Sequence, residues 1–444
     1  MKNSISLKQI NKLAIPALIA GISEPVLSLT DAAIVGNIPT NATESLAAVG
    51  IVTTFLSMLI WVLGQTRSAI SSIVSQYLGA DQLDNIKNLP AQAIFIITSL
   101  SLLIILSTYP FAQSIFKLYN ATNLILEYSV DYYKIRVFGF PFTLFTIAIF
   151  GVFRGLQNTY YPMLIAIIGA LSNIILDYIL VYGIEGYINP MHIKGAAYAS
   201  VIAQILMALL SAFYLLKKTS IPLKPSFPFN KEINKFILMV LNLFVRTIAL
   251  NVTLYFASAF ATSYGANYIA AYTIAINLWF LGAFIIDGYA SAGNILSGKL
   301  LGAKQYPLLI TLSNKLIKYG IIVGIITALL GAIFYYPLGT IFSKDPEVLD
   351  SFYSVFYIVL LMQPLCALAF IFDGIFKGLG KMGYLRNVLL FSTFLIFIPV
   401  LFLLDGLDYK LYAIFIALTF WIIARGIPLI IKFRQLFLPL TQKT

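Results

Sequence analysis

The chain alternates between long apolar runs and short polar connections. A helix that crosses a bilayer needs about 20 mostly apolar residues, and twelve runs come close to or exceed that length. Proline falls inside several of them, which membrane helices tolerate where neighbouring helices satisfy the freed backbone groups. We therefore predict an all-α membrane protein with twelve transmembrane helices, at residues 13–36, 46–71, 92–112, 130–153, 162–182, 195–216, 236–263, 269–295, 316–337, 351–376, 386–404 and 411–431.

The apolar runs repeat between the two halves of the chain. A shift of 223 positions aligns Leu78-Gly79-Ala80 with Leu301-Gly302-Ala303, and Pro141 with Pro364, without a gap. Six helices per half is an even number, so both halves enter the membrane from the same side. We predict a parallel repeat about an axis along the membrane normal, with a substrate path in a central cleft between the halves.

Composition supports a membrane protein. The chain has 444 residues, of which 60% are hydrophobic and 10% charged, whereas a soluble domain carries about 25% charged residues. The net charge of +12 does not indicate nucleic-acid binding, because the cations are scattered at the ends of apolar runs. With Cys366 as the one cysteine, neither a disulfide nor a cysteine metal cluster can form.

Lysine and arginine are distributed unevenly over the connections. With a cytoplasmic N-terminus, the inner side carries roughly three times as many of them as the outer side. An even number of helices then places both termini in the cytoplasm, in a bacterial-type inner membrane. The longest connection, 217–235, is basic and contains three prolines. We interpret it as a cytoplasmic linker between two six-helix lobes, 1–216 and 236–444.

Four oxygen-bearing side chains of the first half fall at similar depths in three predicted helices. Asp31 is about 18 residues along the first helix, or ~27 Å at 1.5 Å per residue, in the outer half of the membrane. Asp177 lies at a similar depth in the fifth helix, with Asn173 one turn below it, and Ser200 lies near the outer end of the sixth. Two carboxylates close together cannot both stay charged without a cation. The pattern predicts a site for a proton or for sodium, which prefers oxygen ligands.

The alternative is that the two aspartates only hold helices together through hydrogen bonds. Ser or Asn would do so at lower cost, because an ionised side chain at mid-bilayer costs at least ~2.5–3.5 kcal/mol. The 223-residue shift maps Asp31 onto Leu254 and Asp177 onto Val400, so the acids are not part of a shared scaffold. Ser200 is a weaker candidate by itself, because a small hydroxyl in a helix is more often a packing residue than a ligand.

Other charges within apolar runs are candidates for gates or further cleft charges. Glu24 lies seven residues before Asp31 on the same helix face, and we hypothesise that it meets Arg246 across the pseudo-two-fold. Arg67 and Asp287, in the second and eighth helices, are a second candidate pair, which would close the cytoplasmic side when the protein faces outward.

Asp373 precedes Lys377 by four residues, which favours a local pair between them. For all of these charges, the alternative is that each reaches water or pairs within its own half.

Motifs for catalysis are missing from the sequence. No Walker A loop, glycine-rich nucleotide turn or metal-protease motif is present. We therefore expect neither an enzyme nor a bound cofactor, only a coupling ion.

The chain resembles the multidrug and toxic compound extrusion family, most closely its DinF-type branch. The resemblance covers nearly the whole chain in the expected order. The matching stretches are Leu27–Asp31 with Val35-Gly36, Leu46–Gly50, Phe153–Thr159, Asn173–Asp177, Gly195–Ser200, and Asp287-Gly288 through to Leu301–Ala303.

The resemblance implies two six-helix lobes around a central cleft, and export of organic cations or other amphipathic compounds by proton or sodium antiport. It also implies that Asp31, Asn173, Asp177 and Ser200 form the coupling site. The family usually has threonine where this chain has Ser200, the loop 186–194 is longer than usual, and Glu24 is not part of the expected pattern. Glu24 would then alter the choice of ion or the charge of the substrate.

Our main hypothesis is a monomeric secondary active exporter of small amphipathic or cationic molecules in contact with membrane lipids. The alternatives are a lipid-linked saccharide flippase of the same superfamily, which generally has extra helices and a more basic cleft, and a non-transporting receptor or scaffold. The acidic cluster of the first half argues against both.

Overall fold

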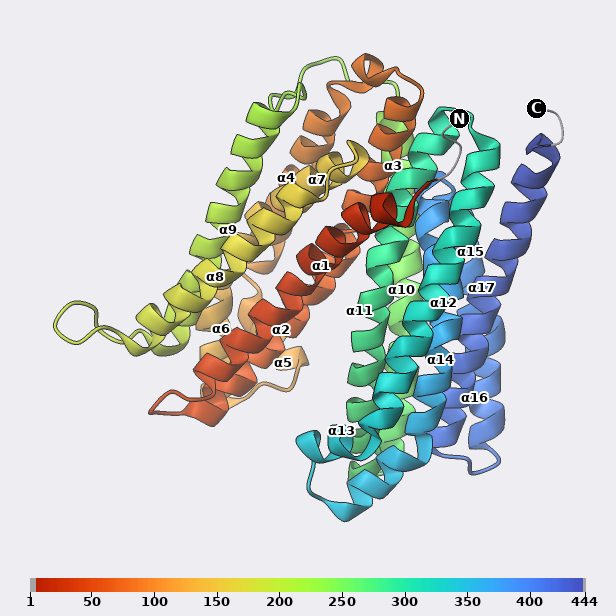
Figure 1. Cartoon of the computed structure of the whole chain (residues 1–444). Coiled ribbons are helices and arrows are strands. Elements are labelled where there is room, and N and C mark those ends of the chain that lie inside the picture. The colour runs from red at the N-terminus through yellow and green to blue at the C-terminus, as the bar shows by residue number, and fades with distance from the viewer. Residues whose placement is uncertain (1–4, 442–444) are drawn as a thin grey trace. The chain divides into compact units, whose positions relative to one another are not determined.

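The computed structural model is all-helical apart from short connections (Figure 1). It describes residues 5–441, without the side chains at positions 23–26, 28 and 29. Within this described part, eleven helices are long and apolar enough to cross a membrane. A further helix, α1 (Leu7–Val35), has 29 residues, or about 43 Å of length. The predicted all-α membrane fold with twelve spanning helices is confirmed.

The elements of the first half agree with the predicted runs, although two runs are interrupted. Pro141 falls in the first turn of α7, where its missing N–H is tolerated, and a 3-10 turn precedes it. The helix predicted at 46–71 ends at Leu63 and resumes at Thr66. After α1, the elements are α2 (Ala42–Leu63), α3 (Thr66–Gly79), η1 (Leu83–Ile86), α4 (Leu89–Thr108), α5 (Ala112–Leu118), α6 (Asn123–Arg136), η2 (Val137–Gly139), α7 (Phe140–Gly155), α8 (Tyr160–Tyr182) and α9 (His192–Lys218).

The second half follows the same plan, with a π-helical segment next to Pro399, which cannot donate a backbone hydrogen bond. Its elements are α10 (Ile233–Ser263), α11 (Ala266–Gly302), α12 (Tyr306–Ile333), α13 (Tyr335–Phe342), α14 (Pro346–Gly378), α15 (Met382–Phe391), η3 (Ser392–Phe397), α16 (Ile398–Asp405) and α17 (Leu411–Thr441).

The 223-residue repeat extends to elements that hydropathy alone did not separate. The short helix α5 begins at residue 112 and α13 begins at residue 335, which is the same shift. The predicted runs 92–112 and 316–337 did not separate these short helices from the long ones before them. The combined span of α6 and α7 ends at Gly155, and α14 ends at Gly378, again 223 positions apart. The repeat is therefore one of helix boundaries as well as of sequence.

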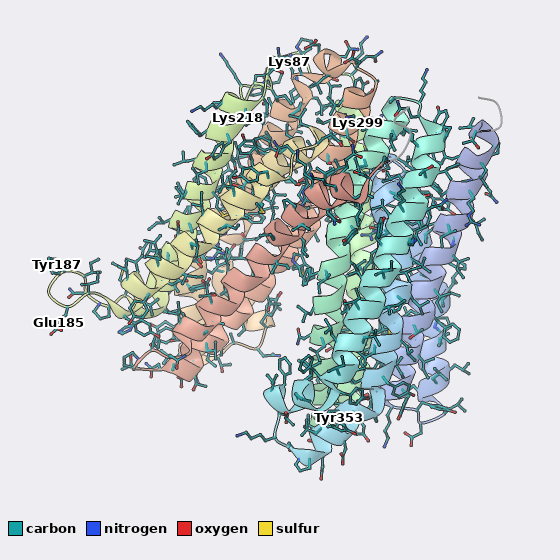
Figure 2. The ribbon with its side chains drawn as sticks, viewed as in Figure 1. Lys87, Glu185, Tyr187, Lys218, Lys299 and Tyr353 are labelled. Atoms are coloured by element: carbon teal, nitrogen blue, oxygen red, sulfur yellow. The ribbon has the colours of Figure 1, made fainter. Side chains whose placement is uncertain are left out.

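The described residues form two compact units. The N-terminal unit contains residues 19–74 and 82–237, and the C-terminal unit contains the described residues up to Leu18, the segment Ser75–Asp81 and everything after Ile237. In Figure 2, Lys87 and Lys218 lie at one end of the N-terminal unit, and Glu185 and Tyr187 lie at its other end. Which of these ends faces the cytoplasm stays a prediction.

Hydrogen bonds attach the connection 217–235 to the start of α4 and to the segment before it. Gln92, which is buried at the start of α4, donates through Nε2 to the carbonyl of Ser226 at 2.5 Å. Its Oε1 accepts from the backbone N–H of Asn230 at 2.9 Å, and Asn230 Nδ2 donates to the carbonyl of Asn85 at 2.9 Å. The connection is thereby fixed to the N-terminal unit.

Small residues let the two longest helices of the C-terminal unit approach closely. The helices α11 and α14 pack along most of their length. A Cβ added at Gly374 of α14 would collide with the backbone of Ala290 in α11. Close backbone approach through Gly, Ala and Ser is the usual source of helix association in membranes.

We expect Gly374→Ala to lower the melting temperature of the purified protein, because the added methyl forces α14 away from α11 at a cost of about 1–3 kcal/mol. Gly50→Ala is the matched control, since nothing lies within 4 Å of a Cβ at that position. Thermal unfolding in detergent measures both. Equal melting temperatures for Gly374→Ala and the wild type would contradict the packing described.

Candidate functional site

Four polar side chains meet inside the N-terminal unit, and none is more than 4% exposed. Asp31 comes from α1, Asn173 and Asp177 come from α8, and Ser200 comes from α9. They lie on the helices that the sequence indicates.

Hydrogen bonds connect the three helices at this point. Ser200 Oγ donates to Asp31 Oδ2 at 2.9 Å, and Asn173 Nδ2 is 3.4 Å from Ser200 Oγ. Asp177 is one helical turn from Asn173 on the same face of α8, and its carboxylate is within electrostatic range of Asp31. The structure thus brings the four residues together.

Acceptor oxygens outnumber donors in this cluster. Both carboxylate oxygens of Asp177, one of Asp31 and the amide oxygen of Asn173 are buried, and none of them has a hydrogen-bond partner in the described part of the chain. Buried polar groups are normally paired, and each unpaired one costs about 1–3 kcal/mol, more when it is charged. An arrangement of buried oxygens with too few donors is suited to a proton or a small hard cation.

Close approach of α9 to α8 positions Ser200. Gly195 lies near the start of the buried face of α9, and a Cβ at this position would meet the carbonyl group of Leu180 in α8. Because glycine has no side chain, the two helices approach there. Ser200, less than two turns further along α9, then reaches Asn173.

Three more residues border the cluster, and sequence reasoning missed their part in it. Tyr132 is fully buried on α6, its hydroxyl has no partner within the described residues, and Asp31 and Asp177 both act on it electrostatically. Arg136, one turn further along α6, donates through Nη1 to Gln204 Oε1 at 2.8 Å. Gln204 lies one turn beyond Ser200. Tyr132 and Arg136 are four residues apart, as are Ser200 and Gln204, so each pair lies on one helix face. This spacing could have been read from the sequence.

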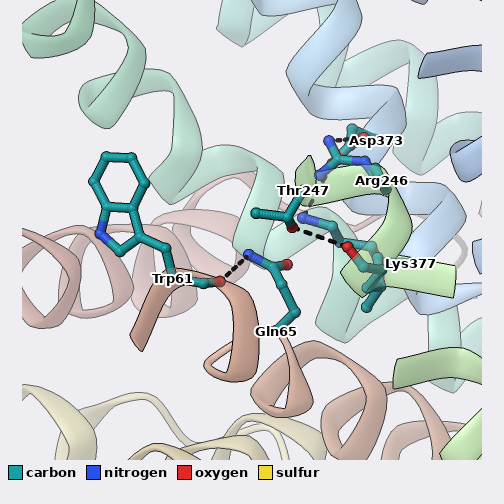
Figure 3. Close-up of polar contacts among 7 residues, drawn as sticks. Trp61, Gln65, Arg246, Thr247, Asp373 and Lys377 are labelled. Carbon is teal, nitrogen blue, oxygen red and sulfur yellow. Dashed lines mark hydrogen bonds and ion pairs between the residues drawn. The ribbon is translucent and has the colours of Figure 1, made fainter. Parts of the chain in front are cut away.

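A second charged cluster lies in the C-terminal unit. Arg246 Nη2 of α10 is 2.5 Å from Asp373 Oδ1 of α14, and Lys377 Nζ is 3.0 Å from Asp373 Oδ2. Figure 3 shows Arg246 and Lys377 beside Asp373. The local Asp373–Lys377 pair is therefore present, and Arg246 joins it.

The proposed gate pairs are not tested by these contacts. The side chain of Glu24 lies outside the described residues, so its contact with Arg246 stays a prediction. Arg67 belongs to the N-terminal unit and Asp287 to the C-terminal unit, and their pairing also stays a prediction. Arg67 lies at the start of α3, and Asp287 is exposed on α11.

Metal chelation by three or more acidic, histidine or cysteine side chains does not occur among the described residues. The cluster at Asp31 offers two carboxylates, one amide oxygen and one hydroxyl instead. These oxygens are of the kind that bind a proton or a small hard cation.

A model of the MatE family matches residues 16–179 and 243–403. The two matches cover more than half of the chain and fall in its two repeated halves. The chain belongs to the MatE family. The resemblance to multidrug and toxic compound extrusion proteins is confirmed, and this MatE protein is thereby placed among transporters.

Curated relatives of this MatE chain come from plants and bacteria. Protein DETOXIFICATION 42 of Arabidopsis thaliana is 26% identical over 455 residues, covering 89% of this chain and 86% of the relative. DNA damage-inducible protein F of Escherichia coli (strain K12) is 24% identical over 438 residues, covering 95% and 91%. Multidrug export protein MepA of Staphylococcus aureus (strain MSSA476) is 23% identical over 341 residues, covering 75% and 73%.

Solved structures show the same fold. A MATE protein in the bent conformation matches with a TM-score of 0.90 at 20% identity, over 98% of this chain and 96% of that chain. The outward-facing conformation of a multidrug resistance MATE family transporter matches with a TM-score of 0.85 at 22% identity, with the same coverage of each chain.

We expect Asp373→Asn to destabilise this MatE protein strongly, because it removes the carboxylate that compensates the buried Arg246 and the partly buried Lys377. Breaking a buried pair typically costs about 3–5 kcal/mol. Asp131→Asn is the control, since its pair with Lys194, at 2.9 Å, is largely exposed and such a pair contributes at most about 1 kcal/mol. Thermal unfolding of both variants measures the difference, and equal losses would contradict the assignment.

Proposed function

We propose that this MatE protein is a secondary active exporter that exchanges an inward-moving proton or sodium ion for an outward-moving organic cation or other amphipathic compound. Membership of the MatE family supports a transporter. One relative, MepA of Staphylococcus aureus, is named for multidrug export. Many apolar helices support a multi-pass membrane location, and we propose the cytoplasmic membrane with both termini inside.

The observation that carries the proposal is the surplus of buried acceptor oxygens at Asp31 and Asp177. Holding two buried aspartates in a membrane is costly, and hydrogen bonds from Ser200 and Asn173 satisfy only part of the cluster. A cation bound there removes this cost, and its release restores it. An ion gradient can use the free-energy difference between the cation-bound and the cation-free cluster to drive transport.

Ion binding would act on helix positions, because the ligands come from three helices. Asp31 is carried by α1, and the oxygens that face it come from α8 and α9. A bound cation draws these helices together. The helix α1 also contains Pro16, which leaves one backbone carbonyl without its helical donor and is a common site of bending.

We expect Asp31→Asn and Asp177→Asn each to abolish gradient-driven efflux while leaving the protein folded in the membrane, because a neutral amide cannot exchange a proton or balance a cation. Proteoliposomes with separately imposed proton and sodium gradients, loaded with a fluorescent amphipathic cation, measure the transport. Asp350→Asn, an exposed position on α14, is the control and should transport normally. Normal efflux in both site variants would refute the coupling role.

We further expect Ser200→Ala to weaken coupling and Ser200→Thr to preserve it, because only the threonine keeps the hydroxyl that donates to Asp31. Loss of a hydrogen bond to a charged group costs about 1.5–3 kcal/mol, so the coupling-ion concentration for half-maximal efflux should shift by roughly 10- to 100-fold. The same transport assay, with ion concentration varied, measures the shift. Indistinguishable dependence on ion concentration in Ser200→Ala would contradict the role of the hydroxyl.

A further inference from the structure

The charged cluster of the C-terminal unit contains more cations than the pairs around Asp373 account for. Arg425, in the middle of α17, is 4% exposed and lies within electrostatic range of both Arg246 and Asp373. The group then holds three cations, Arg246, Lys377 and Arg425, against the single carboxylate of Asp373. Among the side chains that the structure describes, the cations of this group exceed its carboxylates by two.

Among the described residues, Asp373 forms ion pairs with Arg246 and Lys377 but none with Arg425. Its Oδ1 is used by Arg246 and its Oδ2 by Lys377. The sulfur of Cys366, which also lies near Arg425, already accepts a hydrogen bond from Trp279 Nε1 at 3.2 Å. In the described part of the chain, the guanidinium of Arg425 has contacts with aromatic rings but no hydrogen-bond acceptor.

Aromatic rings hold the guanidinium in a fixed place. Its central carbon is 4.5 Å from the ring centroid of Trp421 and 5.3 Å from that of Phe370. Trp421 is itself anchored, because its Nε1 donates to Thr393 Oγ1 at 3.1 Å in the π-helical segment η3. Cation–π contact favours the position of Arg425, but it satisfies none of the five N–H donors of the guanidinium.

The repeat shows which of these charges are specific to the second half. The 223-residue shift maps Arg425 onto Ile202 and Asp373 onto Phe150, whereas Lys377 maps onto Arg154. Arg425 is therefore a cation at a position that is apolar in the first half, just as the first half carries acids at positions that are apolar in the second.

We propose that Arg425, together with Arg246 and Lys377, binds the carboxylate of an organic anion. A planar carboxylate matches the guanidinium fork with two parallel hydrogen bonds. Its negative charge reduces the surplus in the cluster, and the flanking rings of Trp421 and Phe370 suit an apolar or aromatic body attached to the acid. The identification of this anion as exported cargo rests on the proposed exporter function, whereas its binding does not.

Trp421 provides a direct reporter for the test. The chain has three tryptophans, Trp61, Trp279 and Trp421, so Trp61→Phe with Trp279→Phe leaves only the indole beside Arg425. We would titrate this purified protein, in chloride-free buffer, with benzoate and succinate, and with the uncharged benzamide and succinamide. We expect a saturable change in emission with at least one carboxylate and none with its amide.

Substitutions then assign the response to the guanidinium. Arg425→Gln should weaken carboxylate binding by at least about tenfold, and Arg425→Lys should weaken it too, because lysine keeps the charge but loses the fork. Arg434→Gln, an exposed arginine on the same helix, should bind like the parent. The folding of each variant is checked by its melting temperature, and carboxylate-induced stabilisation in the full wild-type protein gives a second readout.

Several outcomes would overturn the proposal. These are no response to either carboxylate, an equal response to the amides, unchanged binding in Arg425→Gln, or a response to chloride alone, which would indicate a halide site. Because binding needs no ion gradient, it is separable from transport. Carboxylate binding without any gradient-driven flux would defeat the exporter proposal and leave the site intact, and the reverse result would defeat the site alone.

Discussion

A bilayer core offers neither hydrogen-bond donors nor acceptors, so this chain must satisfy its own polar groups. Its backbone does so by forming helices almost everywhere. Many hydroxyls do so by bonding to a carbonyl of the preceding turn, as Thr247 Oγ1 does to Leu243 at 2.9 Å. Against this background of satisfied groups, the few buried atoms that have no partner among the described residues are conspicuous. They include both carboxylate oxygens of Asp177 and one of Asp31, where stability alone gives no reason for a charge.

The two clusters are opposite in charge, but in each one kind of group exceeds its partners. Among the described residues of the N-terminal unit, acceptor oxygens exceed donors, which favours binding of a cation. Among those of the C-terminal unit, the cations around Asp373 exceed the carboxylates, which favours binding of an anion. Each cluster is therefore less costly with a solute bound than without one, which is the condition under which a ligand changes the relative stability of two conformations. In the proposed mechanism, the driving ion completes the first cluster and the cargo completes the second.

The fold could be predicted almost entirely from the sequence, because the membrane imposes a minimum length and hydropathy on every spanning helix. The meeting of Asp31, Asn173 and Ser200 could be predicted from their depth along three helices. The contact of Arg136 with Gln204 could not be predicted in this way. The position of Arg136 near a predicted helix end suggests an exposed charge, and the contact depends on the packing of α6 on α9. Arg425 was missed for a similar reason. An arginine within an apolar run, four residues after a tryptophan, was the available signal.

The gapless shift of 223 positions also has a historical meaning. An ancestral six-helix segment that was duplicated in tandem leaves two copies of every structural position in one gene. A substitution in one copy is then buffered by the other, which still supplies the original packing. Asp31 against Leu254, and Ile202 against Arg425, show the two copies diverging toward opposite charges. A homodimer of single segments would carry each of these charges twice, so fusion into one chain was the step that allowed each copy to acquire a cluster of its own.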